Sequence, residues 1–474
     1  MSWANILIAG AATWWCGLAL AQALPFEVAA ALTRAKLPRE AVTLLVVDAE
    51  GKSPPRLSHR AEVLVNPASV MKLVTTYAAL DLLGPAYVWR TPVFVQGVVR
   101  DGTLYGNLVI KGQGDPKLVV ERLWLLLRRV QGLGIGKIAG DIVLDGSAFE
   151  TIDADPASFD GEPLRPYNAA PEALLLNFKS VVMTFVPDRT VNRAQVHFEP
   201  PLAGVQMQGS VALSNTECGD YRAALKADFS DPAQIRFSGA YPAACAEQVW
   251  AVAYADPKSF NLRAVEGMWR EIGGKLGGTV RLGGLTAAPG ATAEPPLEPV
   301  FEIRSPALAE VIRDINKYSN NVMAQQLFLT LSLAAPPASR EASRTLLRRW
   351  WQERIGSNDA PSLDNGSGLS RQDRISAQAL ARLLQSAYRS ALMPELMSSL
   401  PLAGVDGTLR RSRAKTPGHA HLKTGSLRDV TALAGYVHAA SGKRYVLVAI
   451  ANHPNAYAAR PAFDALVDWA LRDN

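Results

Sequence analysis

The spacing of apolar residues predicts two helices that lie beside reactive side chains. After Asn66, a good N-cap, and Pro67, which suits the first helical position, apolar residues recur every three to four positions. This stripe consists of Leu73, Val74, Tyr77 and Leu80. A second stripe belongs to a helix that should end beside Ser319, and it consists of Leu308, Val311, Ile312 and Ile315.

Near the C-terminus the pattern changes to apolar runs that are typical of buried strands. These runs predict strands at 433–437 and 445–450, followed by a terminal helix from about 461 to 471. The segment 421–426 should lie beside these strands in an antiparallel sheet. A sheet packed by helices, with Ser69 on a central helix, would bring these distant segments together.

The chain between the two predicted helices is far longer than one helix and a loop require, which predicts an inserted module. Within it, residues 108–144 and 250–282 repeat one order of features: strand, Asp-Pro turn, helix, glycine, strand. We interpret this echo as two related α/β units. The segment between them, roughly residues 171–245, is expected to be β-rich because residues such as 234–237 alternate between polar and apolar.

The N-terminus has the features of a secretory signal. Residues 6–20 form a short, mostly apolar run, and the small-x-small site Ala21-Gln22-Ala23 follows. We expect cleavage of residues 1–23 and a periplasmic or secreted mature protein. No Lys or Arg precedes the run, and an uncleaved anchor is the alternative, although the run is short for a bilayer. No later run is long and apolar enough to span a membrane.

Removal of the signal leaves two of the three cysteines, Cys218 and Cys245. In an oxidising compartment they are expected to pair and to close a loop inside one subdomain. Two unrelated free thiols are the alternative.

Composition and charge argue against several classes of protein. The net charge of +6 is mild for 474 residues, and the basic cluster at 410–415 fits a solvated loop better than a nucleic-acid site. The six histidines are dispersed, and His419 and His421 have no Cys, Asp or Glu nearby to complete a metal site. The glycines of 132–136 precede a strand, whereas a phosphate-binding loop should follow one. We therefore expect no nucleic acid, metal or cofactor.

A serine and a lysine one helical turn apart provide the strongest candidate chemistry. Ser69 and Lys72 are i, i+3 neighbours, and Ser69 lies near the helix N-terminus, where the dipole favours negative charge. A lysine kept neutral by burial and by a nearby cation can take the serine proton and create a nucleophile. The same spacing recurs at Ser412 and Lys415. Further motifs that follow in a fixed order along the chain must therefore distinguish the two copies.

Such further motifs follow the first copy. The segment Tyr318–Asn321 contains Ser-x-Asn, and the segment Lys423–Ser426 begins with Lys-Thr-Gly. Together the three elements form the motif set of penicillin-binding proteins and class A β-lactamases. Ser412 is not followed by a Ser-x-Asn element and lies in a basic turn. We therefore expect Ser69 to be the nucleophile.

In these motifs, and over essentially the whole mature chain, the sequence resembles a known family. It is similar to the type-C low-molecular-mass penicillin-binding proteins, D-alanyl-D-alanine carboxypeptidases/endopeptidases of the penicillin-binding protein 4 type. Further matches are Gly112–Pro116, Tyr167–Pro171, Asp364–Ser370 and Leu402–Leu409. The resemblance implies an α/β (α+β) serine penicillin-recognising fold, an antiparallel sheet flanked by helices, with a large inserted α/β and β-rich module.

The pattern and the resemblance together divide the chain into a signal, a catalytic domain and an insertion. A stretch rich in Ala and Pro at 287–296 should return the chain to its first domain. The expected division is a signal at 1–23, a catalytic domain at 24–85 and 296–474, an inserted α/β domain at 86–170 and 246–295, and a β-rich subdomain at 171–245.

The resemblance implies a role for each main motif residue. Ser69 attacks the carbonyl between two D-alanines, with Lys72 as general base. Ser319 relays a proton to the departing amine, while Asn321 binds the substrate amide and helps to hold Lys72. Lys423 is a fixed cation for the terminal carboxylate, and it favours the neutral form of Lys72.

Further positions complete the implied site. Thr424 adds a hydroxyl contact to the carboxylate. The backbone N–H groups of Ser69 and Ser426 form an oxyanion hole, with Gly425 allowing the close approach. Water then releases the acyl-enzyme, without a cofactor. The implied partners are peptidoglycan peptides, with β-lactam antibiotics as covalent inhibitors.

Three alternatives stay open at the level of sequence. Tyr318 and Asn320 also fit the Tyr-x-Asn pattern of class C β-lactamases, although the neighbouring matches favour Ser319 and Asn321. A β-lactamase would share the nucleophile but needs no inserted module. A non-catalytic wall-binding scaffold would explain the insertion but not an intact motif set.

Overall fold

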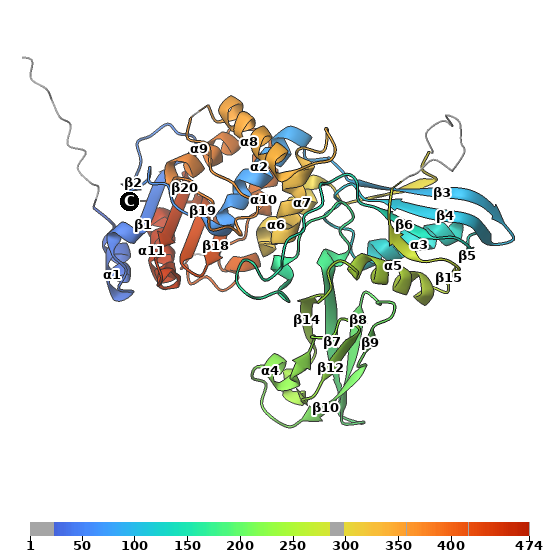
Figure 1. Cartoon of the computed structure of the whole chain (residues 1–474). Coiled ribbons are helices and arrows are strands. Elements are labelled where there is room, and N and C mark those ends of the chain that lie inside the picture. Colours follow the sequence, from blue (N-terminus) through green and yellow to red (C-terminus); the bar gives the residue numbers. More distant parts are fainter. Residues whose placement is uncertain (1–22, 285–297, 357, 416, 474) are drawn as a thin grey trace, which may run out of the picture.

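A computed structural model of the chain describes residues 23–284, 298–356, 358–415 and 417–473. Figure 1 shows a body of helices and sheet, an α/β part on the opposite side, and a smaller β-rich part below. Apart from Ala23, the expected signal peptide and the expected return segment at 287–296 lie outside the described residues. Within the described ranges, no helix is long and apolar enough to cross a membrane.

The body is built on an antiparallel five-stranded sheet in the order β18-β19-β20-β1-β2. The expected antiparallel sheet of 421–426 with the two C-terminal strands is confirmed, since β18 pairs with β19 and β19 pairs with β20. Because β1 pairs with β20, both ends of the described chain build one sheet. The strands are β1 (Val42–Asp48), β2 (Leu57–His59), β18 (Ala420–Leu427), β19 (Val430–His438) and β20 (Arg444–Asn452).

Helices cover both faces of this sheet (Figure 1). Alternate residues of β1 serve the two cores, with Val46 in one and Val47 in the other, as expected for a strand buried on both faces. One face packs on α1 (Phe26–Arg34) and α11 (Arg460–Arg472). The other packs on α2 (Lys72–Leu83), α6 (Leu308–Tyr318), α7 (Asn321–Thr330), α8 (Arg340–Arg354), α9 (Ala377–Tyr388) and α10 (Met393–Ser399).

The turn that carries Ser69 differs slightly from the expected helix start. A 3-10 helix at Ala68–Met71 precedes α2. The side-chain oxygen of Asn66 accepts a hydrogen bond from the backbone N–H of Ala68 at 2.8 Å, so Asn66 still stabilises the start of this turn. Every residue from Lys72 to Leu80 is buried, not only the predicted stripe, because α2 is enclosed by neighbouring helices.

The inserted α/β part is a seven-stranded mixed sheet. Its strands β3 (Arg90–Arg100) and β4 (Thr103–Lys111) form an antiparallel hairpin. Parallel pairing of β4 with β6 and of β6 with β16 joins the two halves of the sequence echo in one sheet, and α3 contacts α5. The remaining elements are α3 (Val120–Gly132), β5 (Lys137–Ile138), β6 (Ile142–Asp145), α5 (Phe260–Glu271), β15 (Lys275–Leu276), β16 (Val280–Leu282) and β17 (Phe301–Arg304).

The β-rich part contains a five-stranded sheet, β13-β10-β8-β7-β14, and a three-stranded sheet, β11-β12-β9. Cys218 and Cys245, the two cysteines expected to pair, form a disulfide here. The predicted strand at 234–237 is β12. The elements are β7 (Ser180–Asp188), β8 (Arg193–Glu199), β9 (Gln206–Met207), β10 (Ser210–Ser214), α4 (Tyr221–Leu225), β11 (Ala227–Asp228), β12 (Gln234–Phe237), β13 (Tyr241–Pro242) and β14 (Gln248–Ala253).

Two strands belong to other sheets than the domain bounds expected from the sequence imply. Residues 250–253, which the sequence pattern predicts as the first strand of the second α/β unit, are part of β14, which pairs with β7 of the β-rich sheet. The strand β17 lies at 301–304, beyond the expected end of the insertion at 295, yet it pairs with β3. A hydrophobic pattern reports that a strand is buried, but not which strand it pairs with, and both differences have this cause.

Replacement of both cysteines, Cys218→Ser and Cys245→Ser, should lower the thermal stability of the β-rich part. The disulfide joins residues 27 positions apart, and closing a loop of that length stabilises the fold by about 3 kcal/mol. Thermal unfolding, with limited proteolysis to locate the cleavage sites, measures the effect. The reactivity of Ser69, which lies in the body, should stay nearly unchanged.

Wild-type protein treated with a reductant is the matched control for this double variant. An unchanged melting transition would contradict a stabilising role for the disulfide. Loss of Ser69 reactivity in a variant that is still folded would show that the insertion is coupled to the chemistry.

Candidate active site

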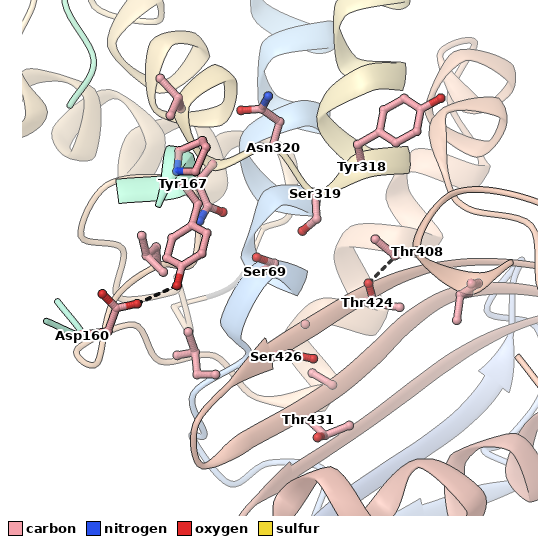
Figure 2. A pocket seen from close by; sticks show the side chains of 18 of the residues that line it. Ser69, Asp160, Tyr167, Tyr318, Ser319, Asn320, Thr408, Thr424, Ser426 and Thr431 are labelled. Atoms are coloured by element: carbon pink, nitrogen blue, oxygen red, sulfur yellow. Dashed lines mark hydrogen bonds between the residues drawn. The ribbon is translucent and has the colours of Figure 1, made fainter. Parts of the chain in front are cut away.

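The three sequence motifs meet at one cavity between the body and the insertion. The cavity encloses about 1280 Å³, and its wall includes Ser69, Ser319, Thr424 and Ser426 from the body and Tyr167 from the insertion. Figure 2 shows these five side chains around the same space. Motifs that are far apart in the sequence thus lie close together in the fold, and the cavity is the candidate active site.

Lys72 lies buried directly behind Ser69. Its Nζ is 2.9 Å from Ser69 Oγ, 2.6 Å from Asn321 Oδ1 and 2.5 Å from the carbonyl oxygen of Ser367. The last two are carbonyl oxygens, which only accept hydrogen bonds. A neutral amine has two N–H donors and one lone pair, so donation to both carbonyls leaves the lone pair for the Ser69 hydroxyl. This is the geometry of a general base that faces a nucleophile.

The surroundings of Lys72 favour this neutral form. Burial lowers the pKa of Lys72 well below its ordinary value, and the charge of Lys423 lowers it further. The buried carboxyl of Asp373 acts in the opposite direction as the smallest of the three effects. Burial also raises the pKa of Asp373 to about 7, so its negative charge is incomplete near neutral pH.

Lys423 is also completely buried, on the strand β18. Its Nζ donates hydrogen bonds to Ser319 Oγ at 2.9 Å and to the carbonyl oxygen of Thr424 at 2.7 Å. Burial lowers the pKa of Lys423 to about 7. In its protonated form Lys423 therefore orients the Ser319 hydroxyl and supplies the positive charge that keeps Lys72 neutral.

The ends of α6 and α7 position the second motif. Ser319 follows α6 with a left-handed φ of 56°, and the side chain of Asn320 caps α7. Asn321 instead contacts the buried lysine behind the nucleophile. Tyr318 is 71% exposed, and its ring points away from Ser69 (Figure 2). The geometry therefore favours Ser319 and Asn321 over the Tyr-x-Asn alternative.

Close backbone contacts hold the nucleophile turn from two sides. A Cβ on Gly425 would lie 2.5 Å from the carbonyl oxygen of Pro67 and 3.1 Å from the nitrogen of Ser69. A Cβ on Gly368, which has a φ of 79°, would lie 2.0 Å from another carbonyl oxygen of the same turn. Only glycine fits at either position. The N–H of Ser69 is consequently held against β18, as an oxyanion hole shared with Ser426 requires.

The second Ser-x-x-Lys sequence does not form a comparable pair. Ser412 Oγ donates to Asp464 Oδ1 at 3.0 Å. Lys415 is exposed, and its backbone N–H donates to Asp468 at 2.9 Å. Within the described residues, Ser412 thus has no buried lysine beside it.

His421 and His438 lie side by side in surroundings that fit a packing role. His421 Nδ1 is 3.2 Å from the carbonyl oxygen of Met397, and the rings of His421 and His438 lie 5.2 Å apart. Burial, reinforced by Arg444, lowers the pKa of His438 to about 4, so this ring is neutral near neutral pH. Across the ranges that the structure describes, no group of three or more His, Cys, Asp or Glu side chains could hold a metal ion.

Sequence reasoning missed the contributions of backbone atoms and of the insertion. Ser367 contacts the buried lysine through its carbonyl oxygen, which no side-chain pattern reveals. Tyr167 lines the cavity, and its hydroxyl donates to Asp160 Oδ2 at 2.8 Å. The matched segments Asp364–Ser370 and Tyr167–Pro171 are the signal that the sequence offers for these contributions.

Comparison with known proteins gives one family match and several relatives. The model of the D-Ala-D-Ala carboxypeptidase 3 (S13) family matches residues 24–472. The chain is 25% identical over 394 residues to the D-alanyl-D-alanine carboxypeptidase DacB of Haemophilus influenzae, covering 81% of this chain and 80% of the relative. It is 27% identical over 401 residues to a D-alanyl-D-alanine carboxypeptidase of an Actinomadura species, covering 80% and 71%.

Solved structures share the fold. The crystal structure of penicillin binding protein 4 (dacB) from Haemophilus influenzae aligns with a TM-score of 0.71 and 22% identity, covering 94% of this chain and 100% of that chain. A predatory endopeptidase of Bdellovibrio bacteriovorus aligns with a TM-score of 0.55 and 13% identity, covering 91% and 94%. At these identities the likeness shows the architecture alone, and the expected fold class is confirmed.

Substitution of the two buried lysines by arginine should have different effects. Lys72→Arg should abolish the reaction of Ser69 with an acyl donor, because an arginine stays protonated and cannot take the serine proton. Lys423→Arg should keep measurable activity, because a cation remains at that position. Rates of acylation measured under identical conditions test both. A wild-type rate in Lys72→Arg would show that Lys72 is not the base.

The pH dependence of kcat/KM provides a second test of the two buried lysines. Because the pKa of Lys423 is lowered to about 7, its positive charge is lost as the pH rises above that value. For an acyl donor that carries a carboxylate, kcat/KM of the wild type should therefore fall on the alkaline side. In Lys423→Arg this fall should move upward by about one pH unit or more, since a guanidinium stays charged. Identical alkaline limbs in both proteins would contradict the role of Lys423.

Proposed function

The chain belongs to the D-Ala-D-Ala carboxypeptidase 3 (S13) family, and on that premise we propose that it hydrolyses D-alanyl-D-alanine ends and cross-links of peptidoglycan peptides through an acyl-enzyme on Ser69. It is a serine hydrolase. The observation that carries the proposal is the 2.9 Å contact between Ser69 Oγ and the buried amine of Lys72. A serine hydroxyl reacts with an amide only when a base removes its proton, and a neutral lysine at this distance is such a base.

Acylation starts with proton transfer from Ser69 Oγ to Lys72 Nζ while the oxygen attacks the carbonyl between two D-alanines. The carbonyl oxygen becomes an oxyanion, which the backbone N–H groups of Ser69 and Ser426 stabilise. The absence of a side chain at Gly425 allows both N–H groups to approach the same oxygen.

The departing amine needs a proton before the peptide bond breaks. The Ser319 hydroxyl, oriented by Lys423, passes on the proton that Lys72 has taken. Asn321 keeps the Lys72 amine in place and offers its own N–H to the amide of the substrate. Water then attacks the serine ester, with Lys72 again as base, and releases the shortened peptide.

The terminal carboxylate of the substrate is recognised at β18. Protonated Lys423 supplies positive potential from behind the strand, and Thr424 presents a hydroxyl to the cavity. A β-lactam antibiotic also combines a reactive amide with a carboxylate, so it uses the same groups. β-Lactams are therefore covalent inhibitors of this enzyme in our proposal.

We propose that the insertion shapes the access of substrates to the site. Phe178, Val182 and Tyr167 contribute to the cavity wall, whereas the acylation steps above use residues of the body. In this proposal the catalytic domain comprises 24–85 and 296–474, except for the strand β17, which pairs with β3 of the insertion. The inserted parts are 86–170, 171–245 and 246–295.

We infer the location of the enzyme from its proposed substrate and its disulfide. Peptidoglycan lies outside the cytoplasmic membrane, and the bond between Cys218 and Cys245 is typical of an oxidising compartment. Export by a cleavable signal at 1–23 gives a periplasmic or secreted enzyme.

Penicillin should acylate Ser69 and no other residue. Its strained amide resembles the D-alanyl-D-alanine bond, and the same attack leaves an ester that water hydrolyses slowly. Intact mass spectrometry after penicillin treatment should show one adduct, and peptide mapping should locate it on Ser69. Ser69→Ala should give no adduct.

Ser412→Ala is the matched control for this labelling, because Ser412 has the same spacing to a lysine. It should react like the wild type. An adduct on Ser412, or none on the wild type, would contradict the assignment of the nucleophile. Rapid turnover of penicillin without a stable adduct would indicate a β-lactamase instead.

Purified muropeptides should be converted to two kinds of product. Mass spectrometry should detect stem peptides that have lost a terminal D-alanine and cross-linked dimers that have been split into monomers. The ratio of the two products measures the balance between carboxypeptidase and endopeptidase activity, and Ser69→Ala is the control. Unchanged muropeptides, in the presence of a stable penicillin adduct, would rule out this substrate.

A further inference from the structure

The cavity presents hydroxyl groups, rather than lysine amines, to a ligand. Lys72 and Lys423 are completely buried, and neither belongs to the cavity wall within the described residues. Ser426, Thr424 and Thr408 do line it. A ligand that enters the cavity can therefore contact these hydroxyls directly, while the lysines act from behind the surface.

Thr408 has a specific relation to Thr424. It is exposed in the cavity, and Figure 2 shows its hydroxyl bonded to the hydroxyl of Thr424. The two oxygens are 2.7 Å apart. Thr408 lies 16 positions before Thr424 in the chain, so the contact results from the packing of two segments.

Thr408 belongs to the segment 401–409, which is fastened along β18. The backbone N–H of Ala403 donates to the carbonyl of Ala420 at 3.0 Å, and the N–H of Leu422 donates to the carbonyl of Pro401 at 2.9 Å. Since β18 is the last strand of its sheet, these bonds cover part of a free edge. The segment thus starts in register with the strand that carries the third motif.

An ion pair fixes the same segment to α6. Lys317 Nζ is 2.6 Å from Asp406 Oδ2, and the side chain of this lysine is only 4% exposed. The backbone N–H of Leu402 donates to the other oxygen of Asp406 at 2.8 Å. A Cβ on Gly407, which has a φ of 55°, would lie 2.6 Å from the carbonyl oxygen of Lys317. Thr408, the next residue, is therefore held in a fixed position relative to the helix that ends beside the second motif.

From this geometry we propose that Thr408 is a substrate-binding residue that, with Thr424, binds the terminal carboxylate of the substrate. Two hydroxyls in contact carry two protons, and the bond between them uses one. The second proton can then point into the cavity, and donation within the pair makes it a stronger donor. The pair offers this donor to an anion in front of the positive potential of Lys423. The inference rests on the proposed function, because that function supplies the carboxylate.

The Thr408 hydroxyl is not needed to hold its segment in place. The segment 401–409 is already held by the ion pair and by backbone hydrogen bonds. A hydroxyl pair that is open to water adds little net stability, because water can replace it. Ser214 and Thr216 form a similar exposed pair, 2.9 Å apart, in the β-rich part, and this pair provides a matched control.

The test uses Thr408→Val, which removes the hydroxyl and keeps the shape of the side chain. Two ester acyl donors share one acyl group, but only one of them has a carboxylate on its leaving group. For the carboxylate ester, kcat/KM should fall roughly tenfold, mostly through a higher KM, because a charge-assisted hydrogen bond is lost. The neutral ester should react within about twofold of the wild-type rate. Thr408→Ser should restore the preference, and Thr216→Val should leave both reactions unchanged.

The outcomes separate this inference from the proposed function. An equal loss with both esters would show that the hydroxyl shapes the site without binding the carboxylate, and no loss with either would remove it from substrate binding. Either result overturns the inference. If the wild type formed an acyl-enzyme with neither ester, the proposed function itself would fail, and that result requires no variant.

Discussion

The burial of one lysine amine is the constraint on which the rest of this site depends. The Nζ of Lys72 contacts its own turn through Ser69, the helix α7 through Asn321, and a third segment through the carbonyl of Ser367. A fully buried amine is tolerated only when it is neutral or well paired, so its partners must be held accurately. The helices packed around α2 provide this enclosure, and the close contact at Gly368 keeps the third segment against the nucleophile turn.

A second buried lysine completes the arrangement. Lys423 and Lys72 repel each other when both are charged, so the neutral form of Lys72 becomes easier to reach. One residue type thereby supplies both a base and a cation, although both lysines are buried. Lys72 is the base because it contacts the Ser69 hydroxyl and because the charge of Lys423 lowers its pKa further. The same burial removes both lysines from the cavity surface, where the hydroxyls of Thr408, Thr424 and Ser426 and the side chains of the insertion are presented instead. Buried side chains thus serve proton transfer, whereas side chains at the cavity surface serve ligand recognition.

Features that depend on local spacing could be predicted from the order of the residues alone. The three-residue interval between Ser69 and Lys72 predicted their contact, because one helical turn brings such residues together. The apolar runs at 433–437 and 445–450 predicted two strands of the central sheet, and these lie in β19 and β20. Ser69 was distinguished from Ser412 because only the former has ordered motifs downstream. Each of these inferences needed only the order and chemistry of the side chains.

Which distant segments meet became visible only in the folded chain. The strands β14 and β17 joined sheets that periodicity did not assign to them, since a buried strand has the same pattern whichever neighbour it pairs with. The contact of Ser367 with the lysine uses a carbonyl oxygen, which every residue possesses, so no sequence pattern marks it. The contact between Thr408 and Thr424 depends on an ion pair and on strand pairing formed elsewhere in the body. Such long-range contacts arise from packing, and local spacing carries no information about them.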